Sequence, residues 1–118
     1  MGRKRGARPI SIRMVEKRKF RRVPLTAVVR AEAAGHPYSV EGRNISAGGM
    51  LVKTEKTLGE GEQLRLEFLL PGELVPVHAI GIVQHVMPGS FMGIRFVEMA
   101  GADRRRIEAY VNAAEASV

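Results

Sequence analysis

Short segments with alternating apolar residues are the feature that most restricts the fold of this chain. In the clearest segment, 63–70, Leu64, Leu66, Phe68 and Leu70 alternate with polar side chains. An apolar residue at every second position is typical of a strand that buries one face. Turn-forming residues such as Gly, Pro, Asn and Ser separate this segment from five similar ones: 25–32, 38–44, 50–54, 75–86 and 91–97.

The pattern changes near the C-terminus, where apolar residues follow helical spacing. Asp103 can cap a helix that continues to about Ala116, with Ile107 and Val111 on its apolar stripe and the arginines at 104–106 facing solvent. Six short strands and one helix in a chain of 118 residues predict a single domain. The predicted fold is all-β: a small closed antiparallel barrel over about 23–97, with a C-terminal α-helix over about 103–116.

The positive charge of the chain is concentrated at its start. Residues 1–22 contain ten Lys or Arg and one acid, whereas the remaining residues contain nine Lys or Arg and eleven acids. We therefore expect residues 1–15 to form a flexible basic arm and residues 16–118 to form the domain. Such an arm attracts nucleotides, nucleic acids or acidic surfaces; the alternative is a tail that only aids solubility.

Two arginines within this basic region are suited to binding an anion or a base. Arg18 and Arg22 lie four residues apart in the sequence. A guanidinium group can donate two hydrogen bonds at once to a phosphate or to the edge of a guanine. By itself, however, a run of charge is usually a solvated surface.

A second polar stretch follows the predicted second strand. Asn44 supplies an amide and Ser46 a hydroxyl, while Gly48 and Gly49 allow another group to approach the backbone closely. By itself this composition is also that of an ordinary turn.

In combination the two stretches resemble the PilZ domain family. Arg18 and Arg22 match an RxxxR motif, and Asn44, Ser46 and Gly49 match a D/NxSxxG motif one hairpin later. The run RKFRRVPL and the late segment GIRF also resemble that family. The resemblance implies a six-stranded split β-barrel that binds cyclic di-GMP, a bacterial second messenger.

The resemblance also implies roles for individual residues. Arg18 and Arg22 would engage phosphates and guanine edges, while Asn44, Ser46 and Gly49 would hold a guanine on the barrel surface. Asn44 stands where the family often has Asp, so it would accept hydrogen bonds without a full charge. Two further cations and a glycine beside the motifs are secondary candidates: Lys17, Arg21 and Gly48.

These implications predict a receptor or adaptor and not an enzyme. Without ligand, the cations of the arm repel one another. Bound nucleotide would neutralise them, pin the arm across the barrel and so change the surface offered to a partner protein. We expect no cofactor beyond the nucleotide ligand. The sequence leaves open the partner, the number of nucleotides bound and the oligomeric state.

Two other functions stay open. One is a PilZ-like module that binds proteins without any nucleotide, and the other is a barrel that binds nucleic acid through its basic arm. Nucleic-acid binding is less favoured because the chain has only two Tyr, four Phe and no Trp. No predicted strand pairs exposed aromatic side chains on which bases could stack.

The composition and spacing of residues exclude several kinds of site. The chain has no cysteine, which removes disulfides, thiolate zinc sites and cysteine nucleophiles. His36 falls in a turn, and the odd spacing of His78 and His85 predicts opposite faces of one strand and no shared metal. No apolar run is long enough to cross a bilayer and no signal sequence follows the basic start, so we expect a cytoplasmic protein.

Overall fold

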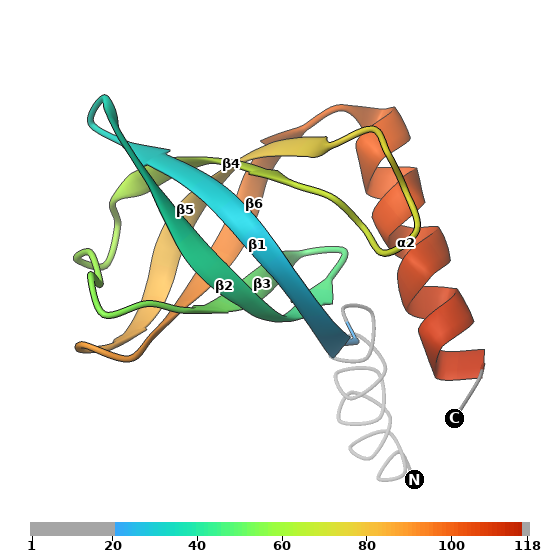
Figure 1. Ribbon diagram of the computed structural model, residues 1–118, viewed down its shortest axis with the longest axis horizontal. Coiled ribbons are helices and arrows are strands. Elements are labelled where there is room, and N and C mark those ends of the chain that lie inside the picture. Colours follow the sequence, from blue (N-terminus) through green and yellow to red (C-terminus); the bar gives the residue numbers. More distant parts are fainter. Residues whose placement is uncertain (1–20, 117–118) are drawn as a thin grey trace, which may run out of the picture.

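A computed structural model describes residues 21–116, which form a closed barrel of six strands followed by a helix (Figure 1). The elements are β1 (Val23–Ala33), β2 (His36–Ser46), β3 (Gly49–Lys53), β4 (Gln63–Phe68), β5 (Val77–Met87), β6 (Phe91–Met99) and α2 (Gly101–Ala116). These elements confirm the predicted all-β fold with a C-terminal helix. The predicted arm at residues 1–15, together with Lys17 and Arg18, lies outside the described residues.

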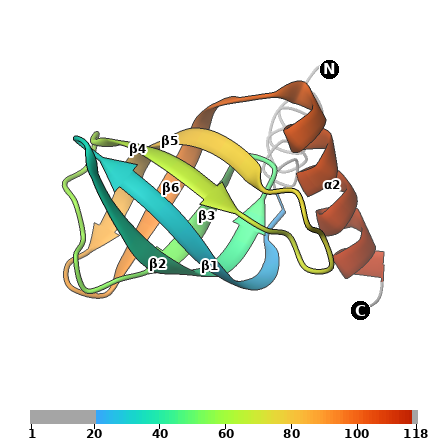
Figure 2. The ribbon, with the colours of Figure 1, turned by 45° about the horizontal axis from the view of Figure 1, so that its top comes forward.

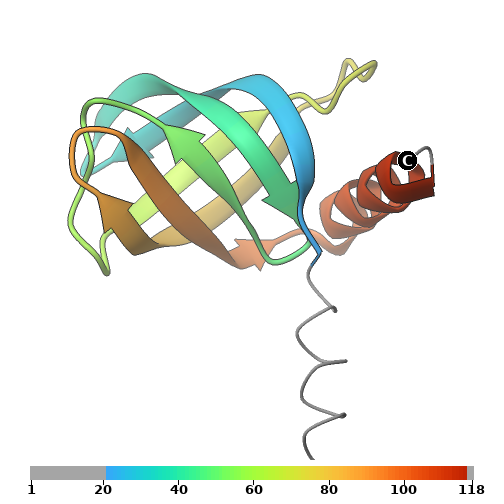
Figure 3. The same ribbon diagram turned by 90° about the horizontal axis from the view of Figure 1, so that it is seen from below.

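All strand pairs are antiparallel, and their order around the barrel is β1-β2-β3-β6-β5-β4. Two of the pairs join strands that are distant in the sequence. β3 pairs with β6 over five residues, and β1 pairs with β4 over only three, Arg30 to Glu32. Figure 3, which views the molecule from below, shows the strands wound obliquely around the closed wall.

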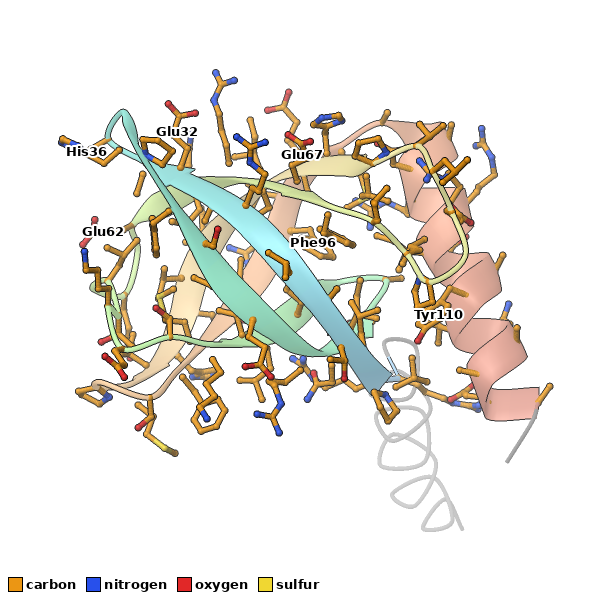
Figure 4. All side chains as sticks on the ribbon, viewed as in Figure 1. Glu32, His36, Glu62, Glu67, Phe96 and Tyr110 are labelled. Carbon is orange, nitrogen blue, oxygen red and sulfur yellow. The ribbon has the colours of Figure 1, made fainter. Side chains whose placement is uncertain are left out.

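The interior of the barrel is filled by alternate side chains of each strand. Leu64, Leu66 and Phe68 of β4 are buried as predicted, because every second residue of a strand points to the same face. Phe96 of β6 is also buried, and Figure 4 shows its ring within the barrel. At Gly81 a Cβ atom would lie 2.4 Å from Cγ2 of Ile94, so a side chain at this position would collide with β6.

Two β-bulges change which side chains face outward. In β2, Gly42 pairs with Val52 and Asn44 with Leu51, so Arg43 is the extra residue of a bulge. Asn44, which strict alternation after Gly42 would turn into the core, therefore lies on the outer face, and the next residue is buried instead.

The second bulge corrects the prediction for the histidines. In β5, Val83 pairs with Ile94 and His85 with Gly93, which leaves Gln84 as the extra residue. The prediction that His78 and His85 lie on opposite faces was wrong, because the bulge reverses the alternation and both side chains are exposed. No group of three or more metal-binding side chains occurs within residues 21–116.

Helix α2 lies across one end of the barrel and packs Ile107 and Val111 into the core (Figure 2). It begins at Gly101, so Asp103 lies in the first turn and is not the N-cap that we predicted. The Asp103 carboxylate instead accepts hydrogen bonds from the main-chain N–H of His78 and from Arg106. Between residues 21 and 116 no helix combines the length and apolar character needed to cross a bilayer.

Candidate functional site

The turn between β2 and β3 is built around a buried serine. Ser46 is only 2% exposed, and its Oγ accepts a hydrogen bond from the main-chain N–H of Gly48 at 3.1 Å. The same hydroxyl donates to the carbonyl of Gly49 at 3.4 Å. The hydroxyl thus both donates and accepts within the turn, and Ser46 fixes the shape of the backbone there.

The glycine that follows is required by packing. A Cβ atom on Gly49 would lie 2.2 Å from the carbonyl oxygen of Ile94, a main-chain atom that cannot move aside as a side chain could. The neighbouring Gly48 carbonyl accepts a hydrogen bond from the N–H of Phe96 at 2.9 Å. The turn therefore lies directly against β6.

Helix α2 holds the same turn from another side. Arg104 Nη1 donates to the carbonyl of Ala47 at 2.9 Å, a charge-assisted hydrogen bond. The prediction that residues 104–106 form a solvated face was wrong for Arg104 and Arg106, because both are half-buried and hydrogen-bonded. A turn anchored by β6 and α2 offers a rigid rim on which a ligand could rest.

Arg22 connects this rim to the chain that precedes the barrel. Its Nη1 donates to Asn44 Oδ1 at 3.0 Å, across the pairing of β1 with β2. The two residues are 22 positions apart in the sequence. The structure therefore brings together one member of each of the two polar stretches that the sequence singled out.

Arg21 contacts helix α2, whereas the neighbouring Arg22 contacts β2. The Nη1 of Arg21 forms an ion pair with Glu115 Oε1 at 2.9 Å, near the end of α2. A second contact with α2 follows at Pro24, whose carbonyl accepts a hydrogen bond from the hydroxyl of Tyr110 at 3.0 Å. Figure 4 shows the side chain of Tyr110 between α2 and the start of β1. The start of β1 is thus held between the rim and the helix.

A row of outward-facing residues extends from Asn44 across four strands. In register, Asn44 pairs with Leu51, Leu51 with Gly93, and Gly93 with His85. Together with Arg22 these residues line an open cleft of about 380 Å³. Because Gly93 has no side chain, the surface is recessed at the middle of the row. A Cβ atom on Gly93 would lie 3.6 Å from Cβ of His85, in ordinary van der Waals contact.

The row combines groups that suit a planar, anionic ligand. Arg22 offers donors, and the amide of Asn44 both donates and accepts. Leu51 and Gly93 leave an apolar floor, and the imidazole of His85 stands at the far end, where a base could stack.

Comparison with known proteins identifies the family. The profile of the PilZ domain matches residues 16–113. The chain belongs to the PilZ domain family. No functionally curated protein matches this PilZ domain.

Three solved structures show how closely the fold agrees. The Bacillus subtilis inhibitor of motility MotI/DgrA has a TM-score of 0.77 at 22% identity, over 85% of this chain and 52% of that one. The PilZ domain of Escherichia coli YcgR with c-di-GMP has a TM-score of 0.67 at 17% identity, over 86% of this chain and 93% of that one. The K. pneumonia MrkH–c-di-GMP complex has a TM-score of 0.71 at 20% identity, over 85% of this chain and 53% of that one.

These likenesses establish the fold of this PilZ domain. The chain spans about half the length of the MotI and MrkH chains that it matches. Of the predicted site residues, Arg22, Asn44, Ser46, Gly48 and Gly49 gather around one turn.

Three residues of the row were not predicted: Leu51, Gly93 and His85. The segment GIRF contains Gly93, but nothing in the local sequence signals the bulge that turns His85 outward.

Proposed function

We propose that this PilZ domain is a receptor for cyclic di-GMP that binds the nucleotide between its basic arm and the rim formed by residues 44–49. The observation that carries the proposal is the contact between Arg22 and Asn44, because it joins the two family motifs at a distance of 3.0 Å. PilZ domains are receptor or adaptor domains and not enzymes.

The chemistry of the ligand matches the groups around this contact. Cyclic di-GMP carries two phosphate charges and two guanines, and guanine N7 and O6 suit a bidentate arginine. Arg22 and Arg18 would supply the guanidinium groups, and Asn44 would accept from the N–H edge of a guanine. Lys17 is an additional cation in this proposal.

Ser46 and Gly49 contribute in this proposal through the shape of the rim. The Ser46 hydroxyl and the close contact of Gly49 with β6 fix the turn whose outer side would support the base. The neighbouring row extends that support, with Leu51 and Gly93 below the ligand and His85 at its far edge.

Binding would reorganise the start of the domain. In the described structure, Arg22 is held by Asn44 and Arg21 by Glu115. A dinucleotide that binds the guanidinium groups of Arg22 and Arg21 would replace these two contacts. It would also order the arm across the rim. Helix α2 would sense the change, because it touches Arg21 through Glu115 and the rim through Arg104, and it would alter the surface offered to a partner protein.

Calorimetric titration with cyclic di-GMP tests the proposal. Arg22→Ala should weaken binding by roughly 10- to 100-fold, which corresponds to about 1.5–3 kcal/mol for a charge-assisted hydrogen bond. Arg65→Ala removes an exposed arginine from β4 and should leave the affinity unchanged. Equal binding by the wild type and Arg22→Ala would show that the nucleotide site is elsewhere.

A further inference from the structure

The pairing that closes the barrel is incomplete. β1 and β4 pair only through Arg30, Ala31 and Glu32 of β1, although β1 begins seven residues earlier, at Val23. Continued in the same register, Val28 would face Leu69, but β4 ends at Phe68. Figure 1 shows the chain after β4 diverging from β1 toward α2. Among the described residues, no strand pairs with residues 25–29 of β1 on this side.

A groove of about 570 Å³ occupies the space where the two strands separate. One wall is formed by residues 26–28 and 30 of β1, and the other by the chain from Glu67 to Pro76. Three of the large apolar side chains that the barrel exposes line this groove: Val28 at 70% exposed, Leu69 at 45% and Leu74 at 92%. Apolar surface concentrated in one place indicates an interaction site more strongly than the same residues scattered singly.

The far wall of the groove is fixed in position. Arg106 of α2 donates to Glu73 Oε1 from Nε at 2.9 Å and from Nη2 at 2.5 Å. It also donates to the carbonyl oxygens of Val75 and Pro76, and its Nη1 bonds Asp103 at 2.8 Å. Because this clamp holds the loop by its backbone, the loop cannot readily collapse onto β1, and the groove stays open.

The charges beside the groove balance within the chain. Arg30 stands opposite Glu67 in the register of the short ladder, and Glu73 forms an ion pair with Arg106. Glu67 also lies 3.7 Å from His78, and Figure 4 shows it on the outside of β4. A charged occupant therefore gains little here, whereas an uncharged apolar one buries Val28, Leu69 and Leu74.

We infer that this groove binds an extended, uncharged segment of a partner protein, which adds as a short strand to residues 25–29 of β1. The free backbone edge of β1 supplies main-chain hydrogen bonds, and the apolar side chains of both walls receive alternate side chains of the segment. The groove has two walls, so it fits a single strand better than a second copy of the barrel. In a second copy, the chain between β4 and β5 would block access to the β1 edge of that copy. The inference does not depend on nucleotide binding.

An NMR titration of the full chain tests this inference with a defined probe. The probe is a capped nonapeptide, added to millimolar concentration, whose seven central residues are alternating uncharged valine and threonine. A lysine at each end, outside the five residues that would pair with 25–29, only keeps the peptide soluble. Saturable shifts are expected for the amides of residues 25–29 and 69–74, and none around Asn44. The same peptide with N-methylated valines keeps its side chains but loses main-chain donors, so its shifts should disappear.

Two substitutions serve as a matched pair. Val28→Lys should weaken peptide binding at least tenfold, whereas Val97→Lys, at an exposed valine on β6, should not change it. Shifts that need no peptide, depend on protein concentration and vanish in Val28→Lys would show that a second copy occupies the groove and overturn the inference. Peptide binding only after deletion of residues 2–20 would overturn it in favour of the chain's own N-terminal segment. The absence of shifts at 25–29 in every form would overturn it outright.

Discussion

The strand β2 has a two-residue turn at each end, and the two turns are built differently. The first, Ala34–Gly35, has positive φ values of 52° and 80°, and a Cβ on Gly35 would meet nothing within 4 Å. The second, Ala47–Gly48, has no positive φ and is held by a buried hydroxyl, by β6 and by α2. The first turn only reverses the chain, through its backbone conformation.

The difference shows where this fold can tolerate change. A turn defined by its own φ values can be altered without affecting distant elements. A turn defined by contacts with a strand and a helix transmits a change in its own conformation to both elements. The proposed function requires such a transmission from the rim. Four substitutions, taken in order of decreasing effect, test this comparison.

Gly49→Ala should have the largest effect. The added Cβ would overlap the Ile94 carbonyl, so β3 and β6 would have to separate, and the free energy of unfolding should fall by about 3 kcal/mol. Urea denaturation followed by circular dichroism measures the loss. The control is Gly35→Ala, for which steric clash is absent and only the left-handed φ costs about 1 kcal/mol. Equal losses would mean that the second turn is no more constrained than the first.

Ser46→Ala comes next. Removing the buried hydroxyl leaves the N–H of Gly48 without its acceptor, and the free energy of unfolding should fall by about 2 kcal/mol. Ser39→Ala, at an exposed serine of the same strand, is the matched control and should cost far less. If both variants unfold at the same urea concentration, the hydroxyl does not define the turn.

Arg104→Gln should have a smaller and more local effect. The loss of its hydrogen bond to the Ala47 carbonyl should cost about 1 kcal/mol. Amide hydrogen exchange in residues 46–49 should accelerate, while exchange in the first turn stays the same. Arg105→Gln, at the exposed neighbour on α2, controls for the change of charge. Unchanged exchange at 46–49 would show that Arg104 does not stabilise the rim. The proposed coupling between the rim and α2 would then be wrong.

Ala34→Asn should be mildly stabilising. Asparagine tolerates the left-handed conformation that Ala34 adopts, and Asn-Gly is the preferred pair for a hairpin turn with two positive φ values, so a gain of about 0.5 kcal/mol is expected. Ala47→Asn places the same residue in the second turn. No residue of that turn has a positive φ that asparagine would favour, so the stability should not increase. Thermal unfolding of the two variants makes the comparison. A gain at both positions would contradict the distinction between the turns.

The sequence by itself determined the elements of this protein and, where no bulge interrupts a strand, the buried face of each strand. Alternation in segments such as 63–70 predicted the strands and their buried side chains, because a strand repeats every two residues whatever its partners. The RxxxR and D/NxSxxG motifs identified the family and the region of the candidate site, through Arg18, Arg22, Asn44, Ser46 and Gly49.

The tertiary structure alone decided the geometry of the candidate site and of the groove beside β1. The bulges at Arg43 and Gln84 turn Asn44 and His85 outward, and each bulge is set by the register between two strands. The contact of Arg22 with Asn44 and the clamp of Arg106 on the β4–β5 loop likewise join residues far apart in the chain. Local patterns carry no information on such registers and contacts, because they are fixed only when distant segments pack together.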